Sequence, residues 1–332
     1  MVIRHSRGSY TVNFGALNDL WGAIPAGAFI ITDDRIASHY PELLHQRPAL
    51  VLPNGEHTKS IPYLGQCCEW LATQRADRKS MVVALGGGVI GDLVGFVAAT
   101  YLRGVKYTQV PTTLLAQVDS SVGGKVAIDI PQGKNLVGAF YPPTEVLVST
   151  DFWQTLPQRQ WAAGMAEAWK YGFILDRSLC MSLSKGQKDL EMVRRCVALK
   201  KHVVEDDEFE TKDFRAILNF GHTIGHAIEQ QSNYQLLHGE AISIGMVLEA
   251  RLGENLEITR RGVAAEIAAY LATEGLPTTV PAQMDSAALL ELMMRDKKVV
   301  GGRLAMSLLS DIGACKLVRD IPNEAVLEVL TS

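Results

Sequence analysis

Three histidines carry the clearest chemical signal in this sequence: His222, His226 and His238. A separation of four residues places the first two imidazoles on one face of a helix. Neutral imidazole is the commonest metal ligand among side chains, and it also titrates near neutral pH. The cluster therefore predicts a metal site, an acid–base residue, or both; the alternative is a set of hydrogen-bonded core histidines.

The surrounding segment predicts one helix over residues 215–231 with a polar face that lines a site. Its polar side chains recur at helical spacing: Arg215, Asn219, His222 and His226. Gly221 and Gly225 lie inside this predicted helix, where each glycine costs ~1 kcal/mol relative to alanine. We therefore expect another group to approach the helix backbone closely at these two positions.

An acid and a base lie three residues apart in an otherwise apolar predicted helix, namely Glu167 and Lys170. Neither charged side chain is stable in an apolar environment without a partner. A metal ion for Glu167 and an anionic substrate for Lys170 would supply those partners.

Gly86, Gly87 and Gly88 lie between an apolar strand and a predicted helix. Glycines there allow a ligand close to the backbone, and a helix N-terminus offers N–H groups to a phosphate. The turn predicts a dinucleotide site, although a tight structural turn gives the same pattern. Asp33, at the end of an earlier strand, is a candidate for a ribose hydroxyl or for a helix N-cap.

Two further lysines follow glycines. Lys125 comes after Gly123-Gly124, and Lys134-Asn135 comes after Gly133. Glycine beside lysine suits a phosphate or carboxylate that the backbone also touches, whereas a single loop lysine is usually only solvated. Asp119 and Arg103 lie in the same glycine-rich region, which favours the anion site.

The periodicity predicts an α/β fold in the first half and a mostly helical second half. Apolar runs predict strands near residues 28–32, 49–52, 81–85, 107–110, 126–130 and 145–148. Helix-like segments near 36–45 and 60–74 separate the early runs, which is typical of a parallel sheet covered on both faces. Further helices are expected at 158–173, 190–205, 215–231, 239–254 and 262–274, with a short ribbon near 306–309. We expect two domains, residues 1–150 and 151–332.

The composition argues against several classes of protein function. The chain has 332 residues, 47% of them apolar, and a formal net charge of −4, which argues against a nucleic-acid-binding protein. Its five cysteines form no CxxC pair and are expected to be reduced thiols of a cytoplasmic protein. No apolar run reaches the ~18 residues of a membrane span, so no membrane partner is expected.

Several long motifs resemble the 3-dehydroquinate synthases, within the sugar-phosphate cyclase superfamily. The first half contains ALGGGVIGDLVGFVAATYLRGV, VPTTLLAQVDSSVGGK and GKNLVGAFY, and the second contains GMAEAWKYG, RAILNFGHTIGHAIE, LLHGEA and RDKK. The resemblance covers most of the chain. It implies a Rossmann-like NAD-binding domain, a helical metal- and substrate-binding domain with the active site between them, and a homodimer.

The resemblance also implies cofactors and ligands. It predicts NAD and one divalent metal, Zn²⁺ or Co²⁺, bound by Glu167, His222 and His238. The spacing alone would instead pair His222 with His226. Under the resemblance, His226 becomes an acid–base or phosphate-contacting residue.

The remaining roles follow the family's motifs, with Asp119 matching both groups. The implied substrate-contacting residues are Arg103 (reaching a neighbouring subunit), Lys125, Asn135, Lys170, Lys200, Arg215, Asn219 and one or both of Lys297 and Lys298. The implied NAD-contacting residues are Asp33, Glu56, Lys59, Gly86, Gly87, Gly88, Asp92, Thr112, Thr113, Asp119, Lys134 and Thr155. The chain departs from the family pattern by one additional residue between Glu210 and Arg215.

The implied reaction converts 3-deoxy-D-arabino-heptulosonate 7-phosphate into 3-dehydroquinate and phosphate, the second step of the shikimate pathway. It proceeds by transient oxidation with NAD, phosphate elimination, reduction and intramolecular aldol closure. The alternatives are a cyclase acting on a neutral sugar phosphate and a metal-dependent polyol dehydrogenase. A non-catalytic NAD-binding regulator is a third alternative, but the complete set of predicted metal and lysine positions argues against it.

Overall fold

The computed structural model describes residues 1–45, 47–294 and 304–331. By its internal contacts the chain divides into two compact units, Met1–Pro157 and Gln158–Ser332. Strands and helices alternate in the first half of the chain, and helices dominate the second half. This element order confirms the predicted fold class.

The first unit is built on a seven-stranded sheet in the order β1-β2-β9-β6-β5-β3-β4. The strands are β1 (Val2–His5), β2 (Gly8–Phe14), β3 (Phe29–Asp33), β4 (Ala49–Leu52), β5 (Met81–Gly86), β6 (Lys106–Pro111) and β9 (Glu145–Val148). All neighbours are parallel except β1 and β2. The chain leaves β3 toward β4 on one side and continues from β5 to β6 on the other. This reversal between β3 and β5 is where open α/β sheets bind ligands, at the carboxyl ends of the strands.

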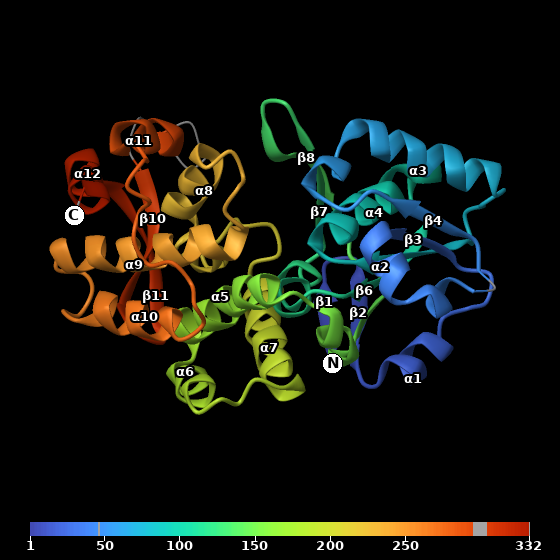
Figure 1. Ribbon diagram of the computed structural model, residues 1–332, viewed down its shortest axis with the longest axis horizontal. Coiled ribbons are helices and arrows are strands. Elements are labelled where there is room, and N and C mark those ends of the chain that lie inside the picture. The colour runs from blue at the N-terminus through green and yellow to red at the C-terminus, as the bar shows by residue number, and fades with distance from the viewer. Residues whose placement is uncertain (46, 295–303, 332) are drawn as a thin grey trace. The chain divides into compact units, whose positions relative to one another are not determined.

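Helices cover both faces of this sheet (Figure 1). On one face lie α3 (Ile61–Thr73) and α4 (Gly88–Thr100), and on the other lie α1 (Leu17–Gly22) and α2 (Asp34–His39). The hairpin of β7 (Lys125–Ile130) and β8 (Gly133–Phe140) forms a separate two-stranded sheet. The short helices are η1 (Pro41–Leu44), η2 (Glu56–Thr58), η3 (Tyr101–Arg103), the π-helix η4 (Ala116–Ser120) and η5 (Thr150–Thr155).

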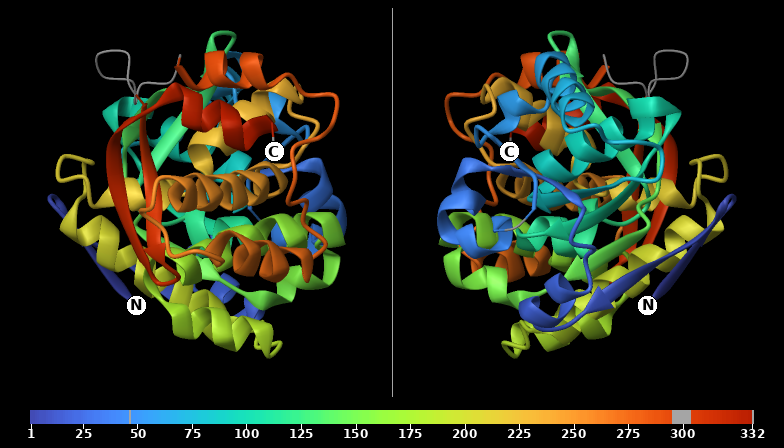
Figure 2. Two further views of the ribbon diagram at one scale, coloured as in Figure 1. Left: turned by 90° about the vertical axis from the view of Figure 1, so that its left-hand side faces the viewer. Right: turned by 90° about the vertical axis from the view of Figure 1, so that its right-hand side faces the viewer.

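The second unit consists of helices around one antiparallel ribbon. The helices are α5 (Gln158–Leu175), α6 (Arg177–Ser184), α7 (Leu190–Asp206), the 3-10 helix η6 (Arg215–Asn219), α8 (His222–Gln231), α9 (His238–Asn255), α10 (Val263–Ala272), α11 (Ser286–Met294) and α12 (Asn323–Thr331). The ribbon of β10 (Leu304–Asp311) and β11 (Ala314–Ile321) runs beside α9 (Figure 2). Leu248, Leu308 and Val329 belong to the apolar core that joins these elements.

The predicted continuous helix over 215–231 is wrong. The chain forms the short 3-10 helix η6, turns out of helical geometry at Phe220, and begins α8 only at His222. Gly221 is the N-cap of α8 with φ 80°, a left-handed conformation that glycine adopts without strain. Arg215 and Asn219 therefore do not share a regular helical face with His222 and His226.

The group that approaches the glycines is helix α9. A Cβ atom on Gly225 would lie 2.9 Å from the Ile242 Cα, and one on Gly245 would lie 2.0 Å from the Gly221 carbonyl oxygen. The predicted close approach exists, and its cause is the crossing of two helix backbones.

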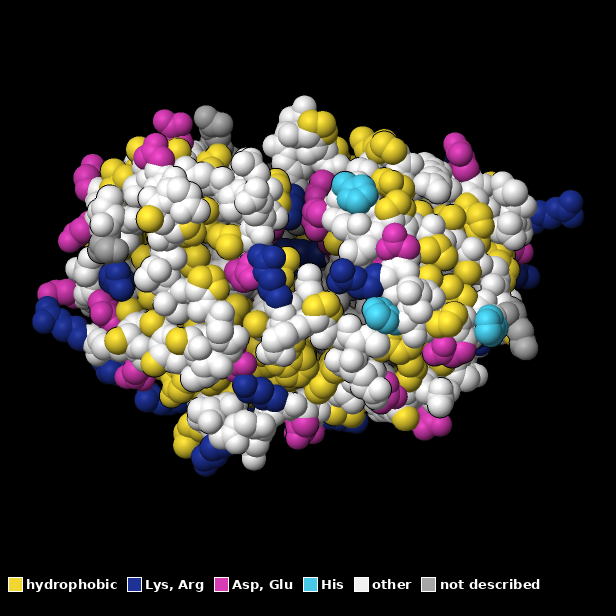
Figure 3. Space-filling model, viewed as in Figure 1, with side chains coloured by type: hydrophobic (Ala, Val, Ile, Leu, Met, Phe, Trp, Pro, Cys, Tyr) yellow, Lys and Arg dark blue, Asp and Glu magenta, His cyan; other side chains and the backbone are white. Residues whose placement is uncertain are grey.

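Among the described residues, no helix is long and apolar enough to cross a membrane. The face drawn in Figure 3 carries acidic and basic side chains interspersed with apolar ones.

Candidate active site

Three helices of the second unit bring Glu167, His222 and His238 together. Glu167 lies in α5, and the two histidines are the first residues of α8 and α9. The Glu167 Oε1 atom lies 3.4 Å from the His222 Nε2 atom and 3.3 Å from the His238 Nε2 atom. One carboxylate oxygen and two imidazole nitrogens thus converge.

These distances fit a metal-binding donor set. Bonds of about 2.0–2.1 Å to a tetrahedral zinc ion separate neighbouring ligand atoms by ~3.4 Å. The second nitrogen of each ring is also engaged: the Nδ1 atom of His222 lies 3.1 Å from the Phe220 carbonyl oxygen, and that of His238 lies 3.2 Å from Glu229 Oε2. Metal-binding histidines usually donate their second N–H to such oxygens, so the arrangement suits a divalent metal.

His226 lies beside the same cluster. Ligand atoms of His222, His226 and His238 all lie within 4.8 Å of one another. The structure therefore brings the HxxxH pair and the Glu167-containing set into one place. His226 is the most exposed of the three histidines.

Burial and charge set the protonation of this cluster. Burial disfavours the Glu167 carboxylate, but the Lys170 ammonium and the two imidazoles outweigh it and hold its pKa well below the usual range. Burial and the nearby Lys170 lower the pKa of His222 to about 4. Burial also opposes protonation of His238, but hydrogen bonds with Glu167 and Glu229 raise its pKa to about 9.

Lys170 forms an ion pair with Glu167, and its side chain is 2% exposed. The Glu167 carboxylate and the Lys170 ammonium, which both require a partner when buried, thus pair with each other. An ammonium ion at this depth, one contact from the donor set, is positioned to attract an anionic group of a substrate.

Arg215 is the first residue of η6, and it contacts the segment that precedes this helix. The guanidinium donates to the Glu208 carbonyl oxygen and lies 3.9 Å from the Glu210 carboxylate, and the side chain is 3% exposed. The Asp207 carboxylate accepts the Arg215 backbone N–H at 3.0 Å. The backbone of this loop is left-handed at Glu210 (φ 58°) and Asp213 (φ 63°).

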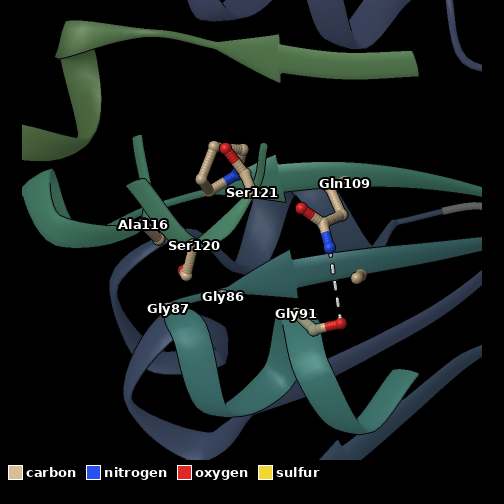
Figure 4. A pocket seen from close by; sticks show the side chains of 9 residues that line it. Gly86, Gly87, Gly91, Gln109, Ala116, Ser120 and Ser121 are labelled. Carbon is tan, nitrogen blue, oxygen red and sulfur yellow. Dashed lines mark hydrogen bonds between the residues drawn. The ribbon is translucent and has the colours of Figure 1, made fainter. Parts of the chain in front are cut away.

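A glycine turn in the first unit forms a second candidate site. Gly87 is the N-cap of α4, and no side chain caps this helix. A Cβ atom on Gly87 would lie 3.0 Å from Thr113 Cγ2, and one on Gly88 would lie 3.2 Å from Ser120 Oγ. Figure 4 shows the pocket that Gly86, Gly87 and Ser120 line. An uncapped helix N-terminus behind bare backbone suits a phosphate group.

Buried hydroxyl groups adjoin this turn. Within residues 1–45, 47–294 and 304–331, the hydroxyls of Thr32, Thr112 and Ser121 are buried without a hydrogen-bond partner. Because such groups are normally paired, a polar ligand at the ends of β3 and β6 would satisfy them. The residues present therefore fit a dinucleotide.

Asp33 is the N-cap of α2. Its Oδ1 atom accepts the Ile36 N–H at 3.0 Å, and burial raises the pKa of its carboxyl group. The structure thus shows Asp33 as a helix N-cap. Because β3 pairs with β5, Asp33 and Gly86 lie at the ends of neighbouring strands.

Several other predicted residues form one charged cluster beside α4. Lys59 forms an ion pair with Asp92 at 2.6 Å and also contacts Asn135. Lys134 pairs with Glu56 at 3.3 Å. The structure thus joins Asn135, predicted to contact substrate, with residues predicted to contact NAD.

The elements that carry the other predicted residues are as follows. Lys125 begins β7, Asp119 lies in η4, Lys200 lies in α7, and Arg103 ends η3 with φ 67°. The Thr155 hydroxyl lies 2.8 Å from the Tyr40 hydroxyl. Lys297 and Lys298 fall outside the described residues.

Comparison with known proteins decides the family. The N-terminal profile of 3-dehydroquinate synthase matches residues 49–163, and the C-terminal profile matches residues 164–299. The chain belongs to the 3-dehydroquinate synthase family. The 3-dehydroquinate synthase of Opitutus terrae is 44% identical over 312 residues, which cover 90% of this chain and 86% of that one.

Solved structures of related cyclases share the fold of this family member. The chain matches 2-deoxy-scyllo-inosose synthase, complexed with carbaglucose-6-phosphate, NAD⁺ and Co²⁺, with a TM-score of 0.86 and 26% identity over 99% of this chain and 98% of that one. It matches 2-epi-5-epi-valiolone synthase from Streptomyces hygroscopicus, with NAD⁺ and Zn²⁺ bound, with a TM-score of 0.88 and 23% identity over 100% and 98%.

Two buried carboxylates of this 3-dehydroquinate synthase family member escaped the sequence reasoning. Glu229 contacts His238, as described above. Glu249 of α9 is fully buried and accepts backbone N–H groups at the start of α8, from Gly221 at 2.6 Å, Thr223 at 3.0 Å and Ile224 at 3.2 Å. The sequence feature that could have indicated them is an acidic residue among apolar residues of a predicted helix, the same feature that singles out Glu167.

Proposed function

We propose that this enzyme is a 3-dehydroquinate synthase that converts 3-deoxy-D-arabino-heptulosonate 7-phosphate into 3-dehydroquinate and phosphate. The observation that carries the proposal is the 44% identity with a 3-dehydroquinate synthase over 90% of the chain, against 26% with 2-deoxy-scyllo-inosose synthase. The geometry of the two candidate sites supports it, because the reaction needs both a dinucleotide and a divalent metal.

We assign Glu167, His222 and His238 as the ligands of one Zn²⁺ or Co²⁺ ion, and the β5–α4 turn with Asp33 as the NAD site. When bound, these groups supply the transient oxidation of a substrate hydroxyl and the acidification of that hydroxyl. Residues 1–150 then form the NAD-binding domain, and residues 151–332 form the metal- and substrate-binding domain. We further propose a cytoplasmic homodimer.

The chain's own side chains bind and orient the substrate. Lys170 and Arg215 are buried cations suited to its phosphate and carboxylate. His226, exposed beside the ligand cluster, holds or accepts a proton at an imidazole nitrogen. The ion pair of Lys170 with Glu167, and the position of His226 beside His222 and His238, support the assignment of Lys170 and His226 to one substrate site.

Substrate selectivity tests the proposal. The heptulosonate phosphate, sedoheptulose 7-phosphate and glucose 6-phosphate are supplied separately with NAD and Co²⁺, and phosphate and carbocyclic products are measured. We expect turnover of the heptulosonate phosphate alone. Preferential turnover of either neutral sugar phosphate would contradict the proposal.

A further inference from the structure

Glu229 is a buried carboxylate to which the assignments above give no role. It lies in α8, seven residues and thus two helical turns after His222, and is 5% exposed. A carboxylate at this depth requires a polar or charged partner. Its Oε2 atom lies 3.2 Å from the Nδ1 atom of His238.

The His238 ring is held between two acidic side chains. Its Nε2 atom faces Glu167 at 3.3 Å, and its Nδ1 atom faces Glu229. An imidazole that binds a metal through one nitrogen carries its hydrogen on the other, and an acceptor there fixes both the tautomer and the ring orientation. Glu229 occupies the acceptor position.

The loop between the two helices brings these residues together. Asn233 and Tyr234 adopt left-handed backbone with φ 51° and 60°, and α9 begins at His238 a few residues later. The first residue of α9 thereby returns to the last turns of α8.

We propose that Glu229 is a positioning residue that orients His238 for metal binding through an Nδ1–H hydrogen bond. The inference rests on the metal site assigned under the proposed function. The corresponding acceptor for His222 is the Phe220 backbone carbonyl, which no side-chain substitution removes. Glu229 is therefore the orienting group that mutagenesis can reach.

The test is a Co²⁺ titration of the metal-free full-length protein, followed by the visible d–d spectrum and by competition with a chelator. We expect Glu229→Gln to raise the Co²⁺ Kd by roughly 10- to 100-fold and to shift the d–d bands. Glu229→Asp is expected to retain part of the affinity. Glu274→Gln is the matched control, because the Glu274 side chain is 4% exposed and pairs with Trp169 and Lys188 instead of a candidate ligand.

The outcomes separate the two proposals. If the wild type binds Co²⁺ tightly and Glu229→Gln binds it equally well with an unchanged spectrum, Glu229 is not a positioning residue and the metal site stands. If the wild type itself fails to bind, the metal site is wrong and the inference falls with it. A variant that only unfolds at lower temperature, with unchanged affinity when folded, also overturns the inference.

Discussion

His222 and His238 differ in protonation although both rings face the same carboxylate. The pKa of His222 is lowered to about 4, and that of His238 is raised to about 9. In the metal-free protein near neutral pH, the His222 ring is therefore neutral and the His238 ring carries a proton. Metal binding requires both rings neutral, so it must release the proton of His238.

This difference predicts a pH-dependent metal affinity. Below the raised pKa of about 9, each fall of one pH unit makes the His238 proton harder to displace. We expect the apparent Co²⁺ affinity to rise about tenfold per pH unit between about pH 7 and pH 9. Titrations in matched buffers measure this slope, and a flat profile would show that His238 is not a ligand.

The Arg215 guanidinium offers a second test at the residue scale. A guanidinium can hold a carboxylate with two parallel hydrogen bonds, which lysine cannot reproduce. We expect Arg215→Lys to lower kcat/KM for the heptulosonate phosphate by roughly 30- to 1,000-fold, or about 2–4 kcal/mol. NAD and Co²⁺ affinities should change little.

The contacts of Arg215 with the Glu208 carbonyl and Glu210 suggest a competing structural role. If that role dominates, Arg215→Lys will lower Tm while kcat/KM per folded molecule stays normal. Measuring both quantities on the same preparation distinguishes the two explanations.

At the scale of elements, the site depends on how closely α8 and α9 pack. Each helix begins with one proposed ligand, and their glycines allow the backbones to cross. Glu249 of α9 also accepts three backbone N–H groups at the start of α8. The spacing of His222 and His238 therefore depends on the helix crossing.

Gly225→Ala tests this crossing. The added Cβ atom would lie 2.9 Å from the Ile242 Cα, so the helices must separate. We expect a loss of about 1–3 kcal/mol in the free energy of unfolding, measured by urea denaturation. Gly65→Ala in α3 is the control, because its Cβ atom meets nothing within 4 Å and should stabilise by about 0.5–1 kcal/mol. Equal effects of the two substitutions would contradict the packing argument.

The elements were predictable where local pattern decided them. Apolar runs predict β3 and β5 because buried parallel strands are continuously apolar. β1, β2 and β8 were missed because polar residues interrupt them, and the break at Gly221 was missed because the polar spacing around it still fits a helix. Contacts such as Glu229 with His238 depend on tertiary packing, and no spacing in the sequence specifies them.

At the scale of the whole molecule, family membership covers both units of the chain, since the two profiles meet between residues 163 and 164. The proposed reaction returns the hydride to the same substrate molecule, so it consumes no net NAD. A polyol dehydrogenase of the same general fold would instead release NADH in proportion to product. Cofactor stoichiometry therefore separates the two reactions.

The most direct measurement follows phosphate, 3-dehydroquinate and NADH together in one reaction. The full-length protein is given Co²⁺, excess heptulosonate phosphate and NAD at only a few per cent of the substrate concentration. We predict many molecules of phosphate and 3-dehydroquinate, in equal amounts, per molecule of NAD, with no accumulation of NADH. Product formation that stops when NAD has been converted to NADH would contradict the proposed function.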